Sequence, residues 1–176
     1  MKTTAAVLLI AALMAAPVSA SAAAPPPTKP VPTGFFSGRW YEIARLPTKS
    51  QKDCEGSISQ FTGANASGDF NVTQTCRVGS LDGPLKSLAV VGKIMPGADN
   101  AKFTLTFYKL VKQEYWVIDR SESLDWAVMA TPGGNYAWLL SRKPVMPAGE
   151  KATVIAKLKA AGYPVEKLVF PKQPGA

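Results

Sequence analysis

The sequence predicts an all-β fold: an eight-stranded up-and-down antiparallel β-barrel with one C-terminal α-helix and a short ninth strand. Segments rich in β-branched and aromatic residues recur along the chain, with turn-forming residues between them, which is typical of a barrel or a sandwich. Eight strands joined by sequential hairpins can close on themselves and leave no exposed edge. After residue 147 the apolar residues change to a helical spacing, which predicts the single helix.

Residues 1–22 have the pattern of a secretory signal peptide, with cleavage expected within residues 20–24. Lys2 supplies a positive charge, residues 5–16 are apolar, and small residues follow. The apolar run is too short to span a bilayer, which needs about 20 residues. No Cys lies near the cleavage region, so a lipoprotein anchor is not expected. We therefore expect an exported, soluble protein, most simply in the periplasm, with an extracellular location as the alternative.

Residues 23–33 are rich in Ala and Pro and are expected to form an extended tether. The following residues, 34–176, suit one domain with a sizeable core. The eight strands are expected near residues 38–46, 55–62, 69–78, 84–94, 102–110, 114–120, 124–131 and 135–142. Turn residues separate them, for example in segments 63–69 and 96–100.

Two strands show which side chains share a face. Phe103, Leu105 and Phe107 alternate with two threonines, so the three apolar side chains lie on one face of their strand. The same spacing places Tyr136 and Trp138 together on another strand. Aromatic residues that face into an eight-stranded barrel either fill it or line a site for one small ligand.

The helix is expected over residues 148–160, before Gly162 and Pro164. Its apolar stripe consists of Val154, Ile155, Leu158 and Ala161, and Lys151, Lys157 and Lys159 are expected to lie away from that stripe. Residues 165–170 are expected to form the ninth strand.

Two cysteines, Cys54 and Cys76, are expected to form a disulfide, because an even count in an exported chain favours a disulfide over a metal pair. A turn centred near Asn65 would place Ile58 opposite Val72 and Cys54 opposite Cys76. Such a bond contributes about 3 kcal/mol in the chain-entropy model. The alternative is two free buried thiols.

Composition also excludes several functions. The chain has no His, which removes Ser-His-Asp and Cys-His catalysis and the commonest zinc ligand, so no catalytic residue, metal or cofactor is expected. The net charge is +8, but the basic residues are scattered and form no nucleic-acid motif. A solvated basic surface is the simplest interpretation, and a weak contact with an anionic membrane surface is the functional alternative.

Three short motifs identify a resemblance. They are Gly38-Arg39-Trp40-Tyr41-Glu42, Trp138 to Pro144 with Arg142, and Gln173-Pro174-Gly175. Together they resemble the lipocalin family, in its bacterial and apolipoprotein D-like branch. The resemblance implies structural roles for Gly38, Trp40 and Arg142: the Trp plugs the closed end of the barrel and the Arg packs across it, a cation–π contact. Glu122-Ser123-Leu124 departs from the family's second motif, and Trp126 follows it.

The resemblance also implies reversible binding of a small apolar ligand, with fatty acids and lysophospholipids as the class for the bacterial branch. The expected barrel lining is Phe103, Leu105, Phe107, Tyr136, Trp138 and, by its parity with Trp40, Glu42. Lys49, Lys52 or Lys112 would meet the ligand's head group. The alternatives are a lipocalin-fold enzyme that uses Glu42 or Asp119, and an interaction protein with a filled barrel. The chain is expected to be a monomer or a homodimer.

Overall fold

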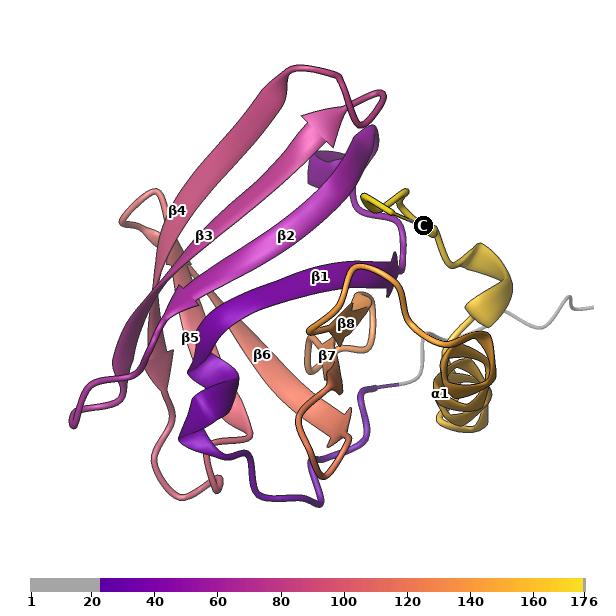
Figure 1. Cartoon of the computed structure of the whole chain (residues 1–176). Helices are drawn as coiled ribbons and strands as arrows, with labels where there is room; N and C mark the ends of the chain where they lie inside the picture. The colour runs from indigo at the N-terminus through magenta and orange to yellow at the C-terminus, as the bar shows by residue number, and fades with distance from the viewer. Residues whose placement is uncertain (1–22, 176) are drawn as a thin grey trace, which may run out of the picture.

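The computed structural model describes residues 23–175, in which eight antiparallel strands close into a barrel (Figure 1). Each strand pairs with its neighbours in the sequence, and the last pairs with the first. The predicted fold class is therefore confirmed. The predicted signal peptide, residues 1–22, lies outside the described residues. The strands are β1 (Ser37–Arg45), β2 (Cys54–Thr62), β3 (Asp69–Val78), β4 (Leu85–Ile94), β5 (Lys102–Phe107), β6 (Val111–Arg120), β7 (Trp126–Ala130) and β8 (Ala137–Ser141).

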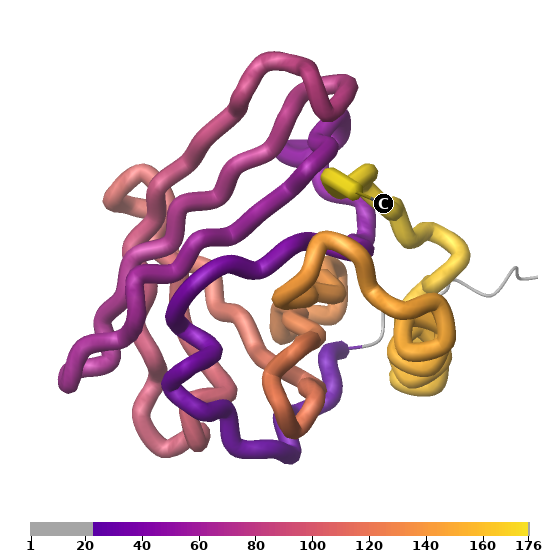
Figure 2. Tube along the Cα trace, in the orientation of Figure 1, coloured from indigo at the N-terminus to yellow at the C-terminus, as the bar shows by residue number. Residues whose placement is uncertain are grey.

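The connections between strands alternate between the two ends of the barrel. The closed end carries the 3-10 helix η1 (Thr33–Phe36) and the turns at 63–68, 95–101 and 121–125. The other end, here called the mouth, carries the turns at 79–84, 108–110 and 131–136. It also carries residues 46–53, the mouth loop, which contains the 3-10 helix η2 (Lys49–Gln51). Figure 2 follows this course, with the β3–β4 hairpin as the highest part of the view.

The lower half of the barrel is filled by aromatic side chains. Phe35 and Phe36 of η1 are fully buried there and pack edge to face, with ring centroids 5.0 Å apart. Phe103 meets Phe36 at 5.5 Å and Phe70 at 5.7 Å. Such offset and edge-to-face contacts stabilise aromatic pairs beyond their burial. We call this cluster the aromatic plug: Phe35, Phe36, Trp40, Phe61, Phe70 and Phe103.

The helix α1 (Ala148–Ala160) has the predicted bounds and packs on the outside of the barrel (Figure 1). Val154 and Leu158 belong to a second core cluster with residues of β1, β7 and β8. All five residues of β7 are buried, because one face of this strand lies inside the barrel and the other joins that outer cluster. Lys157 is exposed, as expected, but its ammonium reaches back to the barrel and lies 5.3 Å from the Trp126 ring centroid.

Several element boundaries differ from those expected. The strand expected over 102–110 ends at Phe107, because Tyr108 and Lys109 turn the chain with φ values of 50° and 62°. β6 begins earlier than expected, at Val111, and β7 and β8 are shorter. The ninth strand, expected over 165–170, is instead a 3-10 helix, η3 (Val165–Lys167), followed by a single bridge between Val169 and Arg45.

The disulfide Cys54–Cys76 is present, with a Cα–Cα distance of 5.3 Å, but the strand register that suggested it is wrong. Ile58 pairs with Thr75 rather than Val72, and Cys54 lies opposite Val78. A bulge in β2 between Glu55 and Ile58 shifts the register by one residue. Because Phe61 pairs with Val72, the hairpin is centred between residues 66 and 67 rather than at Asn65, and the bulge offsets this displacement only in part. The disulfide is therefore diagonal across the hairpin.

Residues 23–32 form neither helix nor strand, as expected for a tether, but they lie against the barrel. The Ala24 amide donates to the Pro132 carbonyl (3.0 Å) near the mouth, and the Val31 amide donates to the Asp99 carbonyl (2.8 Å) at the closed end. Both Ala24 and Val31 are buried. This segment is thus a strap along the outer wall. Among residues 23–175, none of the helices is both long and apolar enough to cross a bilayer.

Candidate functional site

The candidate site is the upper inner wall of the barrel, between the aromatic plug and the mouth. In antiparallel sheets, directly opposite residues share a face, so register identifies the inward side chains. Phe61 and Val72 are opposite each other in the core, and two residues nearer the mouth Ser59 faces Gln74. The next pairing places Leu88 opposite Gln74. The inward side chains above the plug that keep partial solvent exposure are Ser59, Gln74, Leu88, Phe107, Gln113 and Trp138.

Partial exposure of these inward-facing side chains shows that they are in contact with solvent near the mouth. The plug side chains below them are buried, so the solvent exposure of the inner side chains decreases from the mouth toward the closed end. The upper wall is also mixed, with glutamine and serine beside leucine and aromatic rings. Such a wall suits a ligand that combines apolar and polar parts.

A file of aromatic rings connects the mouth to the plug. Tyr136 and Trp138 have ring centroids 6.1 Å apart, Trp138 and Tyr115 are 5.7 Å apart, and Tyr115 stacks on Phe103 at 5.7 Å. Burial raises the pKa of Tyr115 to about 12, so its hydroxyl is neutral at any physiological pH. Tyr136 and Trp138 are the partly exposed rings of this file, while Tyr115 (9% exposed) and Phe103 (0%) belong to the packed core below them.

The structure separates the predicted lining residues by depth. Phe103 and Leu105 are buried at the floor, and Phe107 and Trp138 stand above them on the partly exposed wall. Tyr136 lies outside β8, in the β7–β8 turn, and is 40% exposed at the rim. Of the three lysines expected near a head group, Lys49 and Lys52 lie on or beside η2, exposed on the mouth loop. Lys112 has the outward parity of β6.

Glu42 lies inside the barrel wall, where it pairs with an arginine that sequence reasoning missed. Arg45 is 2% exposed, and its Nη1 donates to the Glu42 carboxylate at 2.5 Å. Burial raises the pKa of Glu42, while the Arg45 guanidinium and a hydrogen bond from Gln51 (2.7 Å) oppose that rise. A bulge in β1 between Glu42 and Ala44 turns Arg45 inward, opposite Trp138. Simple alternation from Glu42 predicts the outward face, so the periodicity concealed this residue.

The mouth loop folds across the mouth and is held there by side chains from inside the barrel. Arg45 Nη2 donates to the carbonyl oxygen of Gln51 at 2.6 Å, and Trp138 Nε1 donates to the Gln51 side-chain oxygen at 3.2 Å. From the opposite wall, Lys86 Nζ donates to the carbonyl oxygen of Ser50 at 2.6 Å. No sequence motif marks Gln51 or Ser50, since their role arises only from the path of the loop.

The C-terminal tail closes the seam where β1 and β2 separate. Their pairing stops at Tyr41 and Ile58, before the bulge of β2. The Gln173 side-chain amide donates to the Glu42 carbonyl at 2.8 Å and to the Ser57 carbonyl at 3.1 Å. Gln173, which the sequence singles out as the start of a motif, thus satisfies carbonyls of both strands behind the Glu42–Arg45 pair.

The motif residues Gly38, Trp40 and Arg142 lie together at the closed end. The Arg142 guanidinium is 3.7 Å from the centroid of the Trp40 indole ring. Gly38 has a left-handed backbone (φ 71°), and a Cβ there would sit 3.5 Å from Arg142 Nη1. Leu124, from the segment that departs from the family's second motif, packs against the inner core from the same end.

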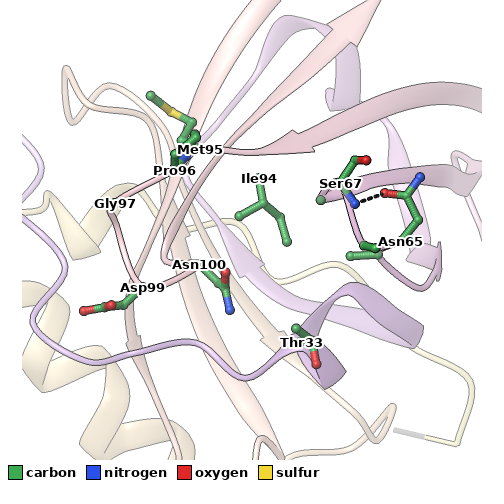
Figure 3. Close-up of a pocket in the computed structure, with 12 residues that line it drawn as sticks. Thr33, Asn65, Ser67, Ile94, Met95, Pro96, Gly97, Asp99 and Asn100 are labelled. Carbon is green, nitrogen blue, oxygen red and sulfur yellow. Dashed lines mark hydrogen bonds between the residues drawn. The ribbon is translucent and has the colours of Figure 1, made fainter.

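A hollow of about 420 Å³ also exists outside the barrel, at the closed end between the turns that follow β2 and β4 (Figure 3). Its polar groups serve the turns themselves. The Asn65 side-chain oxygen accepts from the amides of Ser67 and Asp69, each at 2.9 Å. We therefore assign no function to this hollow.

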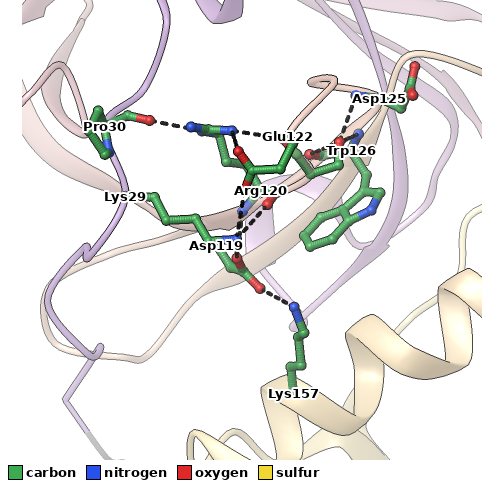
Figure 4. Close-up of polar contacts among 9 residues, drawn as sticks. Lys29, Pro30, Asp119, Arg120, Glu122, Asp125, Trp126 and Lys157 are labelled. Carbon is green, nitrogen blue, oxygen red and sulfur yellow. Dashed lines mark hydrogen bonds and ion pairs between the residues drawn. The ribbon is translucent and has the colours of Figure 1, made fainter.

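Asp119, the other candidate acid of the sequence, lies on the outer surface, away from the upper inner wall. It accepts from Lys157 of α1 at 2.9 Å and pairs with Lys29 of the strap at 3.2 Å (Figure 4). Burial acts to raise the pKa of Asp119, but the hydrogen bonds from Lys157 and Lys29 outweigh it and the pKa is lowered. Asp119 therefore joins strap, barrel and helix.

Comparisons with known proteins identify relatives over most of the chain. The model of the lipocalin-like domain matches residues 33–173. Temperature-induced lipocalin-1 of Arabidopsis thaliana is 28% identical over 141 residues, covering 76% of this chain and 74% of the plant protein. The outer membrane lipoprotein Blc of Citrobacter freundii is 27% identical over 145 residues, covering 80% of this chain and 78% of that protein.

Solved structures share the fold. Insecticyanin from the tobacco hornworm Manduca sexta aligns with a TM-score of 0.67 at 19% identity, over 85% of each chain. The cockroach allergen Per a 4 aligns with a TM-score of 0.64 at 15% identity, over 88% of this chain and 96% of the allergen. At these identities the likeness concerns the barrel architecture alone.

Proposed function

Because the chain belongs to the lipocalin family, in the branch of the bacterial Blc proteins, we propose that it is an exported binding protein for a fatty acid or a lysophospholipid. The ligand lies against the upper inner wall, with its tail toward the plug. The protein serves transport, storage or scavenging of that ligand in the periplasm. Binding of a small hydrophobic molecule is the general property that the family supports, and the ligand class is our proposal.

The observation that carries the proposal is the aromatic file from Tyr136 through Trp138 and Tyr115 to Phe103. An acyl chain along this file leaves water at about 0.8 kcal/mol per methylene. The plug limits the depth of burial, because Phe103 is completely buried and closes the floor. Affinity should therefore rise with tail length and then level off when the tail fills the upper barrel.

The carboxylates that could serve catalysis have structural partners instead. Glu42 is paired with Arg45, and Asp119 lies outside the barrel between two lysines. These partners favour binding over catalysis, so we propose a protein without enzymatic activity.

A contact between the mouth and an anionic membrane surface is a second part of the proposal. At the β5–β6 turn, Tyr108 is 76% exposed, Leu110 86% and Val111 59%. Lys109 lies between Tyr108 and Leu110 in the sequence, and Lys112 follows Val111. An apolar tip with adjacent cations suits the interface of an anionic bilayer. Tyr108 and Lys109 also have a left-handed backbone, which is unfavourable for residues other than glycine. The conformational preference of the turn therefore does not explain why these two residue types stand there.

The test of ligand binding uses delipidated protein and tryptophan fluorescence. Octanoate, dodecanoate and palmitate are titrated in turn, with Trp138→Ala as the variant. Trp116→Ala is the matched control, because Trp116 packs against the outer core cluster. We expect saturable binding, a clear gain from octanoate to dodecanoate, a smaller gain to palmitate, and loss of affinity only in Trp138→Ala. Equal binding of octanoate and dodecanoate, or no binding of either, would contradict the proposal.

Vesicle sedimentation tests the membrane contact. Binding to vesicles that contain phosphatidylglycerol should exceed binding to phosphatidylcholine vesicles, and Leu110→Ser should reduce it. If Leu110→Ser instead converts a dimer into a monomer without changing vesicle binding, the exposed turn is a self-association surface.

A further inference from the structure

We propose that Arg45, Lys86 and Trp138 form a site for an anionic head group, a carboxylate or a phosphate monoester, and that the mouth loop now occupies this site with its own oxygen atoms. The inference rests on the proposed function, because it identifies where the polar end of the ligand binds. In this proposal the three residues bind the head group in place of the lysines that the sequence suggested, Lys49, Lys52 and Lys112.

Hydrogen-bond donors from three strands converge on the mouth loop. Arg45, Lys86 and Trp138 come from β1, β4 and β8, yet all three donate to two consecutive residues of the mouth loop. The acceptors are the carbonyl oxygens of Ser50 and Gln51 and the side-chain oxygen of Gln51. Donors from three separate strands that meet at one small group of oxygen atoms resemble a binding site for an oxygen-rich group.

Two of the three donors are cations, whereas the loop oxygen atoms that they hold belong to neutral amides. Glu42 neutralises Arg45, so Lys86 supplies the net positive charge of the site. Hydrogen bonds between a cation and an anionic oxygen are shorter and about twice as strong as neutral ones. A carboxylate or phosphate therefore satisfies Arg45 and Lys86 better than the loop does, and can displace it.

The two terminal nitrogens of Arg45 have different partners. Its Nη1 is bound by Glu42, which holds the guanidinium in place from inside the wall. Its Nη2 donates only to backbone carbonyls, those of Gln51 at 2.6 Å and Cys54 at 3.3 Å. Movement of the loop takes the Gln51 carbonyl away from Nη2, while the Cys54 carbonyl stays with Nη2 and Glu42 stays with Nη1. A buried cation is then left with one unsatisfied N–H facing the mouth. Such a donor strongly favours a new acceptor.

The loop is built to move between fixed ends. At its start the Leu46 amide donates to the Ala137 carbonyl at 2.9 Å, and at its end Cys54 is tied to Cys76. Between them, none of residues 47–53 is buried. A segment held by polar contacts, without buried apolar side chains, opens at low free-energy cost.

The experiment compares ligands that share a tail and differ in the head group. Dodecanoate, dodecyl phosphate and dodecanol are titrated into wild type, Lys86→Met and Gln51→Ala, with Lys112→Met as the matched control. Lys112 is also an exposed lysine near the mouth, but it faces outward. Arg45 is left intact because removing a buried cation from its partner destabilises the fold.

Wild type should bind dodecanoate or dodecyl phosphate about tenfold more tightly than dodecanol. Lys86→Met should remove most of that preference for the anions. It should not weaken the binding of dodecanol, because the change also removes a hydrogen bond that holds the loop closed. Gln51→Ala should bind both anions more tightly, since it removes the loop oxygen that Trp138 holds and the hydrogen bond from Gln51 to Glu42, and so loosens the loop. Lys112→Met should match wild type. A stronger preference for the phosphate indicates a head that ends in a phosphate monoester, and one for the carboxylate indicates a fatty acid.

The outcomes separate the two proposals. If all three ligands bind wild type equally, or if Gln51→Ala weakens the anions, the head-group site is wrong while ligand binding in the barrel stands. If none of the three binds delipidated wild type, the proposed function itself fails.

Discussion

Arg142 places its guanidinium 3.7 Å from the centroid of the Trp40 indole and donates to the carbonyl oxygens of Gly34 (2.7 Å), Ser37 (2.7 Å) and Arg39 (3.0 Å). The indole Nε1 in turn donates to the Phe35 carbonyl at 2.9 Å. One pair of side chains therefore joins η1, the start of β1 and the end of β8. This relationship seals the closed end under the aromatic plug.

Removing either member should lower stability, with Trp40 the more severe loss. Trp40→Ala opens a cavity beside Phe35 and should lower the free energy of unfolding by about 3–5 kcal/mol. Arg142→Ala loses the cation–π contact and three hydrogen bonds, about 1–3 kcal/mol. Urea unfolding measures both. Arg142→Lys is the control, because it keeps the charge but not the planar fork, and should lie between. If the Trp40→Ala protein is as stable as wild type, the Trp40 side chain does not contribute to the aromatic plug.

Gly92 should tolerate no side chain, because it packs against the face of Phe70. A Cβ at Gly92 would lie 2.2 Å from two ring carbons of Phe70. Gly92→Ala should therefore destabilise the barrel by about 1–3 kcal/mol through overpacking. The double variant Gly92→Ala with Phe70→Leu should be more stable than the sum of the two single changes predicts. Gly149→Ala, at an open position in α1, is the control and should be neutral or slightly stabilising.

The disulfide should contribute measurably to stability. Cys54 and Cys76 are separated by 22 residues, and closing such a loop contributes about 3 kcal/mol in the chain-entropy model. Intact mass under non-reducing conditions should show one bond, and the Cys54→Ser, Cys76→Ser double variant should unfold at lower urea concentration. Quantitative alkylation of two thiols in protein from an oxidising compartment would refute this.

Asp119 should make stability depend on pH in the acidic range. Its pKa is lowered in the folded protein because the hydrogen bonds from Lys157 and Lys29 outweigh the effect of burial. A lowered folded pKa means that the carboxylate stabilises the fold above its ordinary pKa of about 3.9 and that this contribution is lost as pH falls through the folded value. Asp119→Asn should thus be less stable than wild type at neutral pH, and the difference should shrink at about pH 3.

The control for Asp119 is Glu122→Gln. Glu122 also contacts Lys29, at 3.4 Å, but its side chain is exposed, so the change should have little effect on unfolding at either pH. If Glu122→Gln lowers stability as much as Asp119→Asn does, the strap is held by the summed negative charge near Lys29 rather than by Asp119 specifically.

Local patterns in the sequence determined much of this structure. The period-two and helical spacings predicted eight strands in order and the bounds of α1, because side-chain burial on one face depends mainly on residues close in sequence. Two cysteines allowed a single pairing. Phe103, Leu105, Phe107 and Trp138 share the interior, as their alternation predicted.

Only the tertiary structure decided the details of the candidate site. The bulge in β1 changes side-chain parity and turns Arg45 into the barrel, and the β2–β3 turn, which is centred beyond Asn65, leaves Cys54 opposite Val78 rather than Cys76. The mouth loop meets Lys86 and Trp138 only because the barrel brings β4 and β8 around to face it. Bulges and loop paths depend on how strands distant in sequence close into a ring, and a local pattern of apolar and polar residues carries no information on that closure.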